Sequence, residues 1–221
     1  MKNGLLVCAA MILVTVNTTH NNIHHEFCES NLWDHRIEIL NVVTSVGMVY
    51  FPIQSILKHE KSRNYLPEEI LIVVGIGSAL YHYHNSFITA LFDELGMLLF
   101  VATLGHMAFT NKFIRITNIA IFTCAVILKL GGMSSINFSL IFAIYAIYIG
   151  MCSVLNKIMS FGLALKLLTI SLIRQITEDH CLSIPVFFSL LGHPIWHLFI
   201  AKFAVDIADQ VNTHRLHTNK N

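Results

Sequence analysis

Long apolar stretches separated by short polar breaks are the dominant pattern of this 221-residue chain. About 20 apolar residues are enough to cross about 30 Å of hydrocarbon as an α-helix. The pattern predicts seven such helices, over residues 37–57, 70–84, 87–109, 113–130, 136–155, 161–176 and 184–207. Only Asn85 and Ser86 separate the second stretch from the third, which predicts a tight helical hairpin. The predicted fold class is therefore all-α, a polytopic membrane bundle of seven transmembrane helices without a separate soluble domain.

The segments outside the helices divide the chain further. Residues 1–19 place Lys2 before a short apolar stretch, 4–16, and then polar residues, an order typical of a signal peptide, although an extra membrane anchor is the alternative. Residues 20–36 form a predicted lumenal acidic segment, 37–208 the membrane domain, and 209–221 a cytosolic polar tail.

The orientation of the bundle follows from its basic residues, because Lys and Arg in short loops are retained in the cytosol. If the helices alternate, one side of the membrane carries Lys58, Lys61, Arg63, Lys112, Arg115, Lys157, Arg215 and Lys220. The other side carries chiefly Arg36, Lys129 and Arg174, together with Glu26, Glu29, Asp34, Glu38, Glu178 and Asp179. The prediction is an N-terminus that is lumenal or outside and a C-terminus in the cytosol.

The composition agrees with a membrane protein, since 55% of the residues are hydrophobic and 12% are charged. Lys and Arg number 14 against 13 Asp and Glu, which gives a formal net charge of +1. Because a nucleic-acid partner would need a strongly basic face, no nucleic-acid binding is expected. The expected environment and source of ligands is the lipid bilayer.

Polar residues inside three predicted helices are the candidates for chemistry. Ser78 and His82 are four residues apart and share a helical face. Asp93 follows the hairpin turn in the third helix. His193 and His197 have the i, i+4 spacing that lets two imidazoles on one helix bind one metal ion, although Pro194 between them is expected to kink the helix.

An aspartate and three histidines inside membrane helices are energetically costly unless they are paired or bound to a metal ion. Three neutral imidazoles and a water form the open tetrahedral site of a catalytic zinc, so His82, His193 and His197 are predicted zinc ligands. Asp93 is the predicted acid and base for the water, and Ser78 is either a hydrogen-bond donor to the site or a helix-packing serine. His106 has no partner at helical spacing and is interpreted as a histidine that hydrogen-bonds a neighbouring helix.

Two cysteines, Cys28 and Cys181, fall on the predicted lumenal side, where the environment is oxidising. The sequence leaves open whether they form a disulfide or remain free thiols.

Four motifs in order resemble those of the alkaline ceramidases, and the resemblance covers residues 26–207. They are Phe-Cys-Glu-Ser-Asn at 27–31 followed by Glu-Ile-Leu-Asn at 38–41, Gly-Ser-Ala-Leu-Tyr-His at 77–82, Leu-Phe-Asp-Glu-Leu at 91–95, and His-Pro-Ile-Trp-His at 193–197. The resemblance implies a seven-helix, zinc-dependent amidohydrolase that cleaves the amide of ceramide, a membrane lipid, in the endoplasmic reticulum or Golgi. It also implies that Cys28 and Cys181 are paired.

The same resemblance implies a calcium ion in the lumenal segment. The residues at the matching positions are Glu26, the backbone of Phe27, Glu29, Asn31 and Glu38. Oxygen-rich ligands suit calcium, and a solvated acidic face is the alternative.

Two other functions compete with hydrolysis. One is a receptor-like or non-catalytic seven-helix zinc protein of the same superfamily, whose progestin and adiponectin receptor group places its N-terminus in the cytosol. The other is a structural zinc bundle, which is expected to have a closed metal site and no need for an acid such as Asp93.

Overall fold

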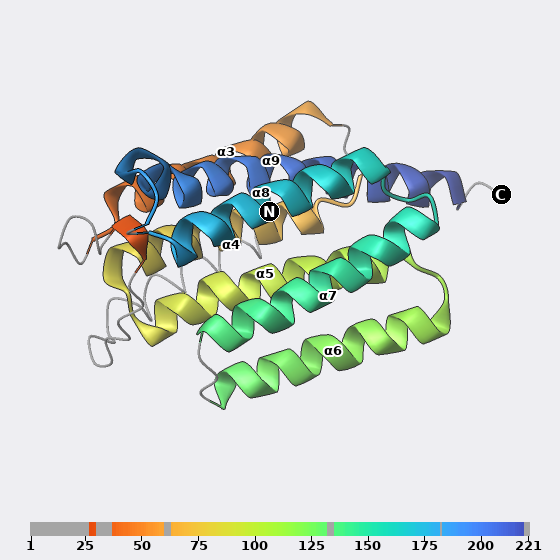
Figure 1. Cartoon of the computed structure of the whole chain (residues 1–221). Coiled ribbons are helices and arrows are strands. Elements are labelled where there is room, and N and C mark those ends of the chain that lie inside the picture. Colours follow the sequence, from red (N-terminus) through yellow and green to blue (C-terminus); the bar gives the residue numbers. More distant parts are fainter. Residues whose placement is uncertain (1–26, 30–36, 60–62, 132–134, 182, 219–221) are drawn as a thin grey trace.

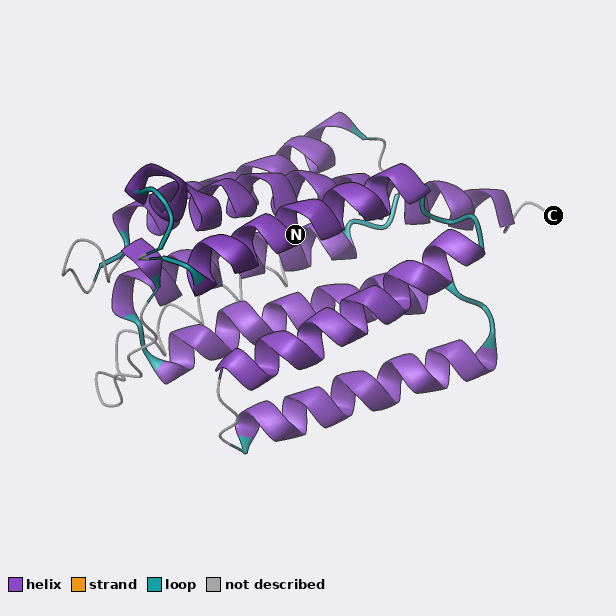
Figure 2. Ribbon diagram, viewed as in Figure 1, coloured by secondary structure: helices purple, strands orange, loops and turns teal. Residues whose placement is uncertain are grey.

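The computed structural model describes residues 27–29, 37–59, 63–131, 135–181 and 183–218. Within these ranges seven long helices follow one another along the chain, and they confirm the predicted all-helical fold (Figure 2). They are α3 (Ile39–Lys58), α4 (Leu66–His84), α5 (Phe87–Ala108), α6 (Lys112–Leu130), α7 (Ser135–Leu155), α8 (Phe161–Asp179) and α9 (Val186–Thr218).

Three helices extend by three or more residues beyond the predicted apolar stretches; one of them, α8, continues past residue 176 to Asp179. Helix α4 begins at Leu66, before the predicted apolar stretch. Its first turn contains Glu68, a fully buried acid that the pattern did not assign to the helix and whose carboxylate pairs with Arg63. Helix α9 continues to Thr218, so residues 209–218, predicted as a polar tail, are helical. Val211 is 1% exposed, which shows that this extension packs against the bundle and explains why the helix does not stop at residue 207.

The helices lie side by side in one elongated bundle (Figure 1). Helix α5 is central and contacts α4, α6, α7 and α9. Helix α3 packs against α4 and α9, and α8 packs against α9, while α6 lies at the edge beside α5 and α7. This arrangement brings α4 and α9 together although they are distant in the sequence.

The outer surface of the bundle is apolar. Leu57, Phe113 and Leu155 are 74%, 76% and 77% exposed, and many other large hydrophobic side chains are exposed with them. A water-soluble monomer rarely exposes so much contiguous apolar surface. Helices α3, α5, α6, α7 and α9 are long and apolar enough to cross a membrane. The chain is therefore a multi-pass integral membrane protein.

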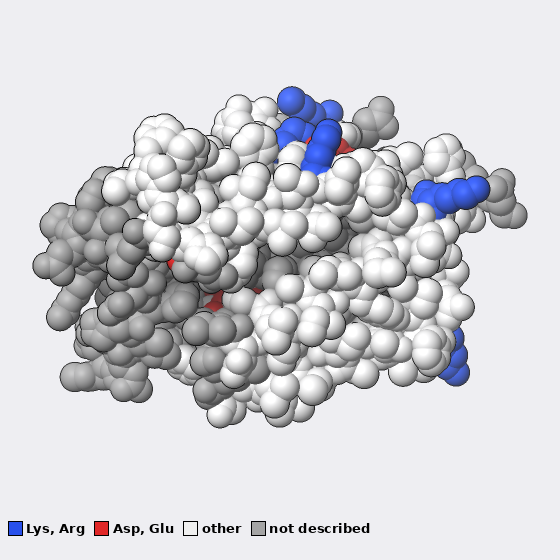
Figure 3. Space-filling model, viewed as in Figure 1, with Lys and Arg blue, Asp and Glu red and all other residues white. Residues whose placement is uncertain are grey.

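Charged side chains are unevenly distributed on the face drawn in Figure 3. Among the described residues on this face, the Lys and Arg side chains lie in the half towards the C-terminus, and a few Asp and Glu atoms are visible in a hollow of the other half. Lys129, a basic residue predicted at the other side of the membrane, lies inside the bundle, where its ammonium group pairs with Glu94.

The predicted hairpin between α4 and α5 is confirmed. Asn85 adopts the left-handed conformation, with φ 44°, and ends α4. The Ser86 hydroxyl accepts a hydrogen bond from the backbone N–H of Thr89, whose hydroxyl in turn accepts from the N–H of Ser86. This capping box fixes the start of α5. A side chain at Gly77 would lie 3.0 Å from the backbone nitrogen of Asp93, so the glycine permits the close approach of the two helices.

Candidate metal centre

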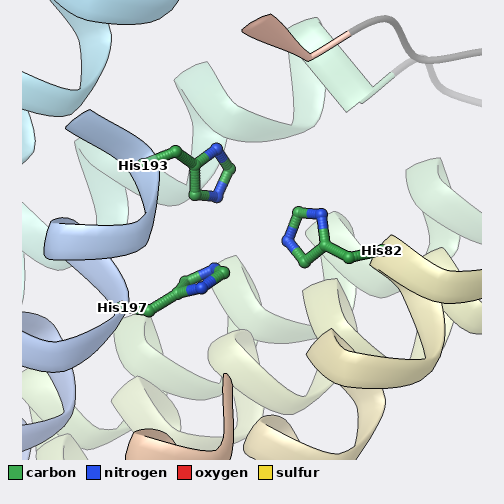
Figure 4. Close-up of side chains that lie close together, drawn as sticks. All are labelled: His82, His193 and His197. Carbon is green, nitrogen blue, oxygen red and sulfur yellow. The ribbon is translucent and has the colours of Figure 1, made fainter. Parts of the chain in front are cut away.

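Three buried histidines converge between α4 and α9 (Figure 4). His82 extends from α4, and His193 and His197 extend from adjacent turns of α9. One nitrogen from each ring lies within 4.8 Å of the other two. The ring centroids of His82 are 5.1 Å from those of both His193 and His197. The three residues predicted to bind a metal are thus brought together, each at most 4% exposed.

Each imidazole is oriented by a hydrogen bond at Nδ1. Nδ1 of His82 lies 2.5 Å from a carboxylate oxygen of Glu38, and Nδ1 of His193 lies 3.0 Å from a carboxylate oxygen of Glu178. Nδ1 of His197 lies 3.1 Å from the hydroxyl of Thr44. A hydrogen-bonded Nδ1–H fixes the tautomer and directs Nε2 to a metal, which is the usual arrangement around zinc-binding histidines. The donor set and its partners therefore fit a zinc ion.

Pro194 does not separate the two histidines of α9. The helix is continuous from Val186 to Thr218, and the ring centroids of His193 and His197 are 4.7 Å apart. Next to them, Gly192 faces Thr177 of α8 so closely that an added Cβ would lie 1.9 Å from the threonine hydroxyl. This contact brings α8 against α9 and places Glu178 within reach of His193.

Ser78 and Asp93 lie beside the histidines in different ways. The hydroxyl of Ser78 is buried, accepts a hydrogen bond from Ser45 at 3.2 Å, and lies 3.5 Å from Nε2 of His197. Asp93 is half-buried, lies in the second turn of α5, and interacts electrostatically with His82 and with Arg174 of α8. The structure thus places a hydroxyl beside His197 and an acid within electrostatic range of His82.

Residues 27–29 cover the end of the site. The ring of Phe27 is 5% exposed and its centroid lies 5.0 Å from that of His82 and 4.9 Å from that of His193. A disulfide joins the next residue, Cys28, to Cys181, with 5.5 Å between their Cα atoms. The backbone N–H of Cys28 also donates to Glu178. These contacts hold Phe27 over the imidazoles.

The described residues give no support to the predicted calcium site. Glu26 and Asn31 lie outside the described residues. Both carboxylate oxygens of Glu29 accept from the backbone N–H groups of Leu40 and Asn41, and so cap α3. Burial raises the pKa of the Glu29 carboxyl, an effect that these two hydrogen bonds oppose.

Glu38 and Phe27, two further residues of the predicted calcium site, make other contacts in the structure. Glu38 contacts His82 and the side-chain amide of Asn41, and the Phe27 side chain packs on histidine rings. Glu38, Glu178 and Thr44 were not predicted as partners of the histidines. The rule that a metal-binding imidazole is hydrogen-bonded to an acid could have directed attention to the two glutamates, but the sequence does not pair either one with a particular histidine.

A model of the ceramidase family matches residues 20–179, nearly three quarters of the chain. The chain belongs to the ceramidase family. This confirms the resemblance found in the motifs, and it supports a ceramidase-type hydrolase, an amidohydrolase by class. The chain matches no curated protein sequence. The ceramidase match ends before α9, so the placement of His193 and His197 at the site rests on the structure and not on the family match.

Proposed function

We propose that the chain is a zinc-dependent ceramidase, which hydrolyses the amide bond of ceramide to a sphingoid base and a free fatty acid. The observation that carries the proposal is the meeting of His82, His193 and His197, each with an oriented imidazole, in a ceramidase-family membrane protein. Zinc, when bound by these residues, lowers the pKa of a water molecule and polarises a carbonyl group.

Asp93 acts as the general base and then as the general acid. Its carboxylate accepts a proton as the water oxygen bonds to the carbonyl carbon, and it returns that proton to the amine nitrogen as the C–N bond breaks. The buried Ser78 hydroxyl, 3.5 Å from Nε2 of His197, would donate its proton to the developing oxyanion. Arg174 of α8 interacts electrostatically with Asp93 and would help to position the acid.

The apolar outer surface favours a substrate that arrives from the bilayer. We further propose the predicted orientation, with the N-terminus lumenal or outside and the C-terminus in the cytosol, in the endoplasmic reticulum or Golgi membrane. The gathering of Lys and Arg towards the C-terminal half of one face supports that orientation. In this arrangement residues 1–19 serve as the signal peptide or anchor, 20–36 as the lumenal segment and 37–208 as the membrane domain.

The proposal is tested with the purified protein in detergent, supplied with ceramide and zinc. We expect release of fatty acid and sphingoid base in equal amounts. Asp93→Asn is expected to lower the rate by about 10²–10⁴-fold, the usual contribution of a positioned acid and base, with zinc content unchanged. Asp206→Asn is the matched control, because Asp206 is an acid on the outer side of α9 that pairs with Lys202.

The same assay decides between the competing functions. His82→Ala is expected to remove both zinc and activity, whereas His84→Ala, at an exposed histidine of the same helix, is expected to change neither. A receptor-like protein or a structural zinc bundle would bind zinc through His82 and yet release no fatty acid from ceramide. Absence of hydrolysis by fully zinc-loaded wild-type protein would overturn the proposed function.

A further inference from the structure

A second polar site lies at the other end of the bundle from the histidines. A cavity of about 400 Å³ opens between the beginning of α4, the end of α5, α6 and the end of α9. Its lining residues are Asn64, Leu66, Ala102, Thr103, His106, Met107, Asn118, Ile119, Phe122 and Arg215. His106 follows Asp93 by 13 residues on α5, which corresponds to about 20 Å along the helix. The cavity is therefore separate from the candidate metal centre.

Two arginines lie at this cavity: Arg215 lines it, and Arg115 is not a lining residue but contacts one, His106. Arg115 of α6 donates from Nη2 to Nε2 of His106 at 2.7 Å, and both Arg115 and Arg215 interact electrostatically with His106. Within the described part of the chain, neither arginine forms an ion pair with a carboxylate, and the cavity lining contains no Asp or Glu. A bound anion would balance the positive charges of Arg115 and Arg215.

Two acids near the cavity in the sequence already have an ion-pair partner. Arg63 pairs with both Glu68 of α4 and Asp209 of α9. Neither carboxylate is ion-paired with Arg115 or Arg215, so these two arginines can bind an anion from outside the chain.

The walls of the cavity also have an apolar part. Leu66, Ile119 and Phe122 contribute to the lining, and Ile119 is 54% exposed on the outer surface of α6. An amphiphile that carries an anionic group fits this combination better than a small polar anion does. Basic pockets between transmembrane helices near the cytosolic interface are typical binding sites for phosphate-bearing lipid headgroups.

We propose that this cavity binds the phosphate headgroup of an anionic phospholipid. Arg115 and Arg215 bind the phosphate oxygens by charge-assisted hydrogen bonds, and the acyl chain lies along Ile119 and Phe122. The site is independent of the proposed ceramide hydrolysis, because none of its residues belongs to the metal centre.

The test is native mass spectrometry of the full-length protein in detergent, titrated with phosphatidic acid and, separately, with phosphatidylcholine. We expect phosphatidic acid to bind more tightly than phosphatidylcholine. The double variant Arg115→Gln/Arg215→Gln is expected to weaken phosphatidic acid binding about 25-fold, or about fivefold for each arginine. The control Lys58→Gln/Lys166→Gln removes the same charge from exposed positions outside the cavity lining and should bind like the wild type.

Competition with inorganic phosphate identifies which part of the ligand is recognised. Displacement of phosphatidic acid by millimolar phosphate would assign recognition to the phosphate group alone, and no displacement would assign it to the intact lipid; both support an anion site. Equal binding of the two lipids, or equal loss in the arginine and lysine variants, would overturn the proposal. The readout is binding, so it does not depend on whether the protein hydrolyses ceramide.

Discussion

Glu38, at the start of α3, and Glu178, at the end of α8, each contact a histidine of the candidate metal centre. Each carboxylate is hydrogen-bonded to Nδ1 of one histidine. With both glutamates ionised, their two negative charges equal the charge of a zinc ion held by three neutral imidazoles. The third histidine, His197, is hydrogen-bonded at Nδ1 to the neutral hydroxyl of Thr44. The site is therefore suited to a divalent cation in a region that disfavours net charge.

Replacing the glutamate behind His82 is expected to weaken zinc binding. Glu38→Gln keeps a hydrogen-bond acceptor for Nδ1 but removes the negative charge, so zinc affinity should fall about 10–100-fold. The measurement is zinc retained by the purified protein during titration with a chelator. Asp206→Asn, which removes a partly exposed carboxylate of α9 that pairs with Lys202, should leave the titration unchanged. Identical curves for Glu38→Gln and the wild type would show that Glu38 does not support a metal ligand.

At the scale of elements, the site depends on close contact between α8 and α9. Gly192→Ala would place a methyl group against Thr177, and relief of that overlap requires the helices to separate. We expect a loss of about 1–3 kcal/mol in stability, measured as a lower Tm in detergent, together with weaker zinc binding because Glu178 moves away from His193.

Gly162 provides the matched control for this prediction. It lies in the first turn of α8, and an added Cβ would meet no atom within 4 Å. Gly162→Ala should therefore leave Tm unchanged or slightly raised, since alanine is the better helix former. If the two alanine variants melted alike, the close contact at Gly192 would not be required for the packing of α8 on α9.

The elements were largely predictable from the sequence because the membrane requires long apolar helices. The hairpin was predictable because only Asn85 and Ser86 separate two apolar stretches. The i, i+4 histidine spacing on α9 identified two residues of the triad. The end of α9 was not predicted, because residues 209–218 are polar in composition and only the buried positions such as Val211 show why they remain helical. The hydrogen-bond partners of the histidines depend on which helices pack together, and that information is not local to any motif.

At the scale of the whole molecule, a covalent link joins the segment before α3 to the turn between α8 and α9. The Cys28–Cys181 disulfide connects residues separated by 153 positions in the sequence. Closing so long a loop restricts the unfolded chain, so Cys28→Ser is expected to cost about 2–5 kcal/mol. Thermal unfolding in detergent measures the loss, and Cys124→Ser, at an exposed free cysteine, is the control.

Mass spectrometry checks the link directly. Digestion without reductant should yield a peptide containing Cys28 bonded to a peptide containing Cys181. Recovery of both as free thiols from protein made in an oxidising compartment would contradict this pairing.

The proposed orientation places the turn between α7 and α8, which contains Lys157, in the cytosol. A protease site inserted after Lys157 should be cut by protease added outside sealed microsomes, whose outer surface is the cytosolic face. The same site inserted after Ser183, in the turn before α9, should be protected until the membrane is opened by detergent. The reverse pattern would invert the proposed orientation.

The covalent ring closed by Cys28 and Cys181 determines how such a cleavage will look on a gel. The turn at Lys157 lies inside that ring, so a chain cut there still migrates as one species until the sulfurs are reduced. Ser183 lies outside it, and a cut at that turn releases the final helix at once under denaturing conditions. Comparing lanes with and without reductant therefore distinguishes the two cut sites by covalent connectivity alone.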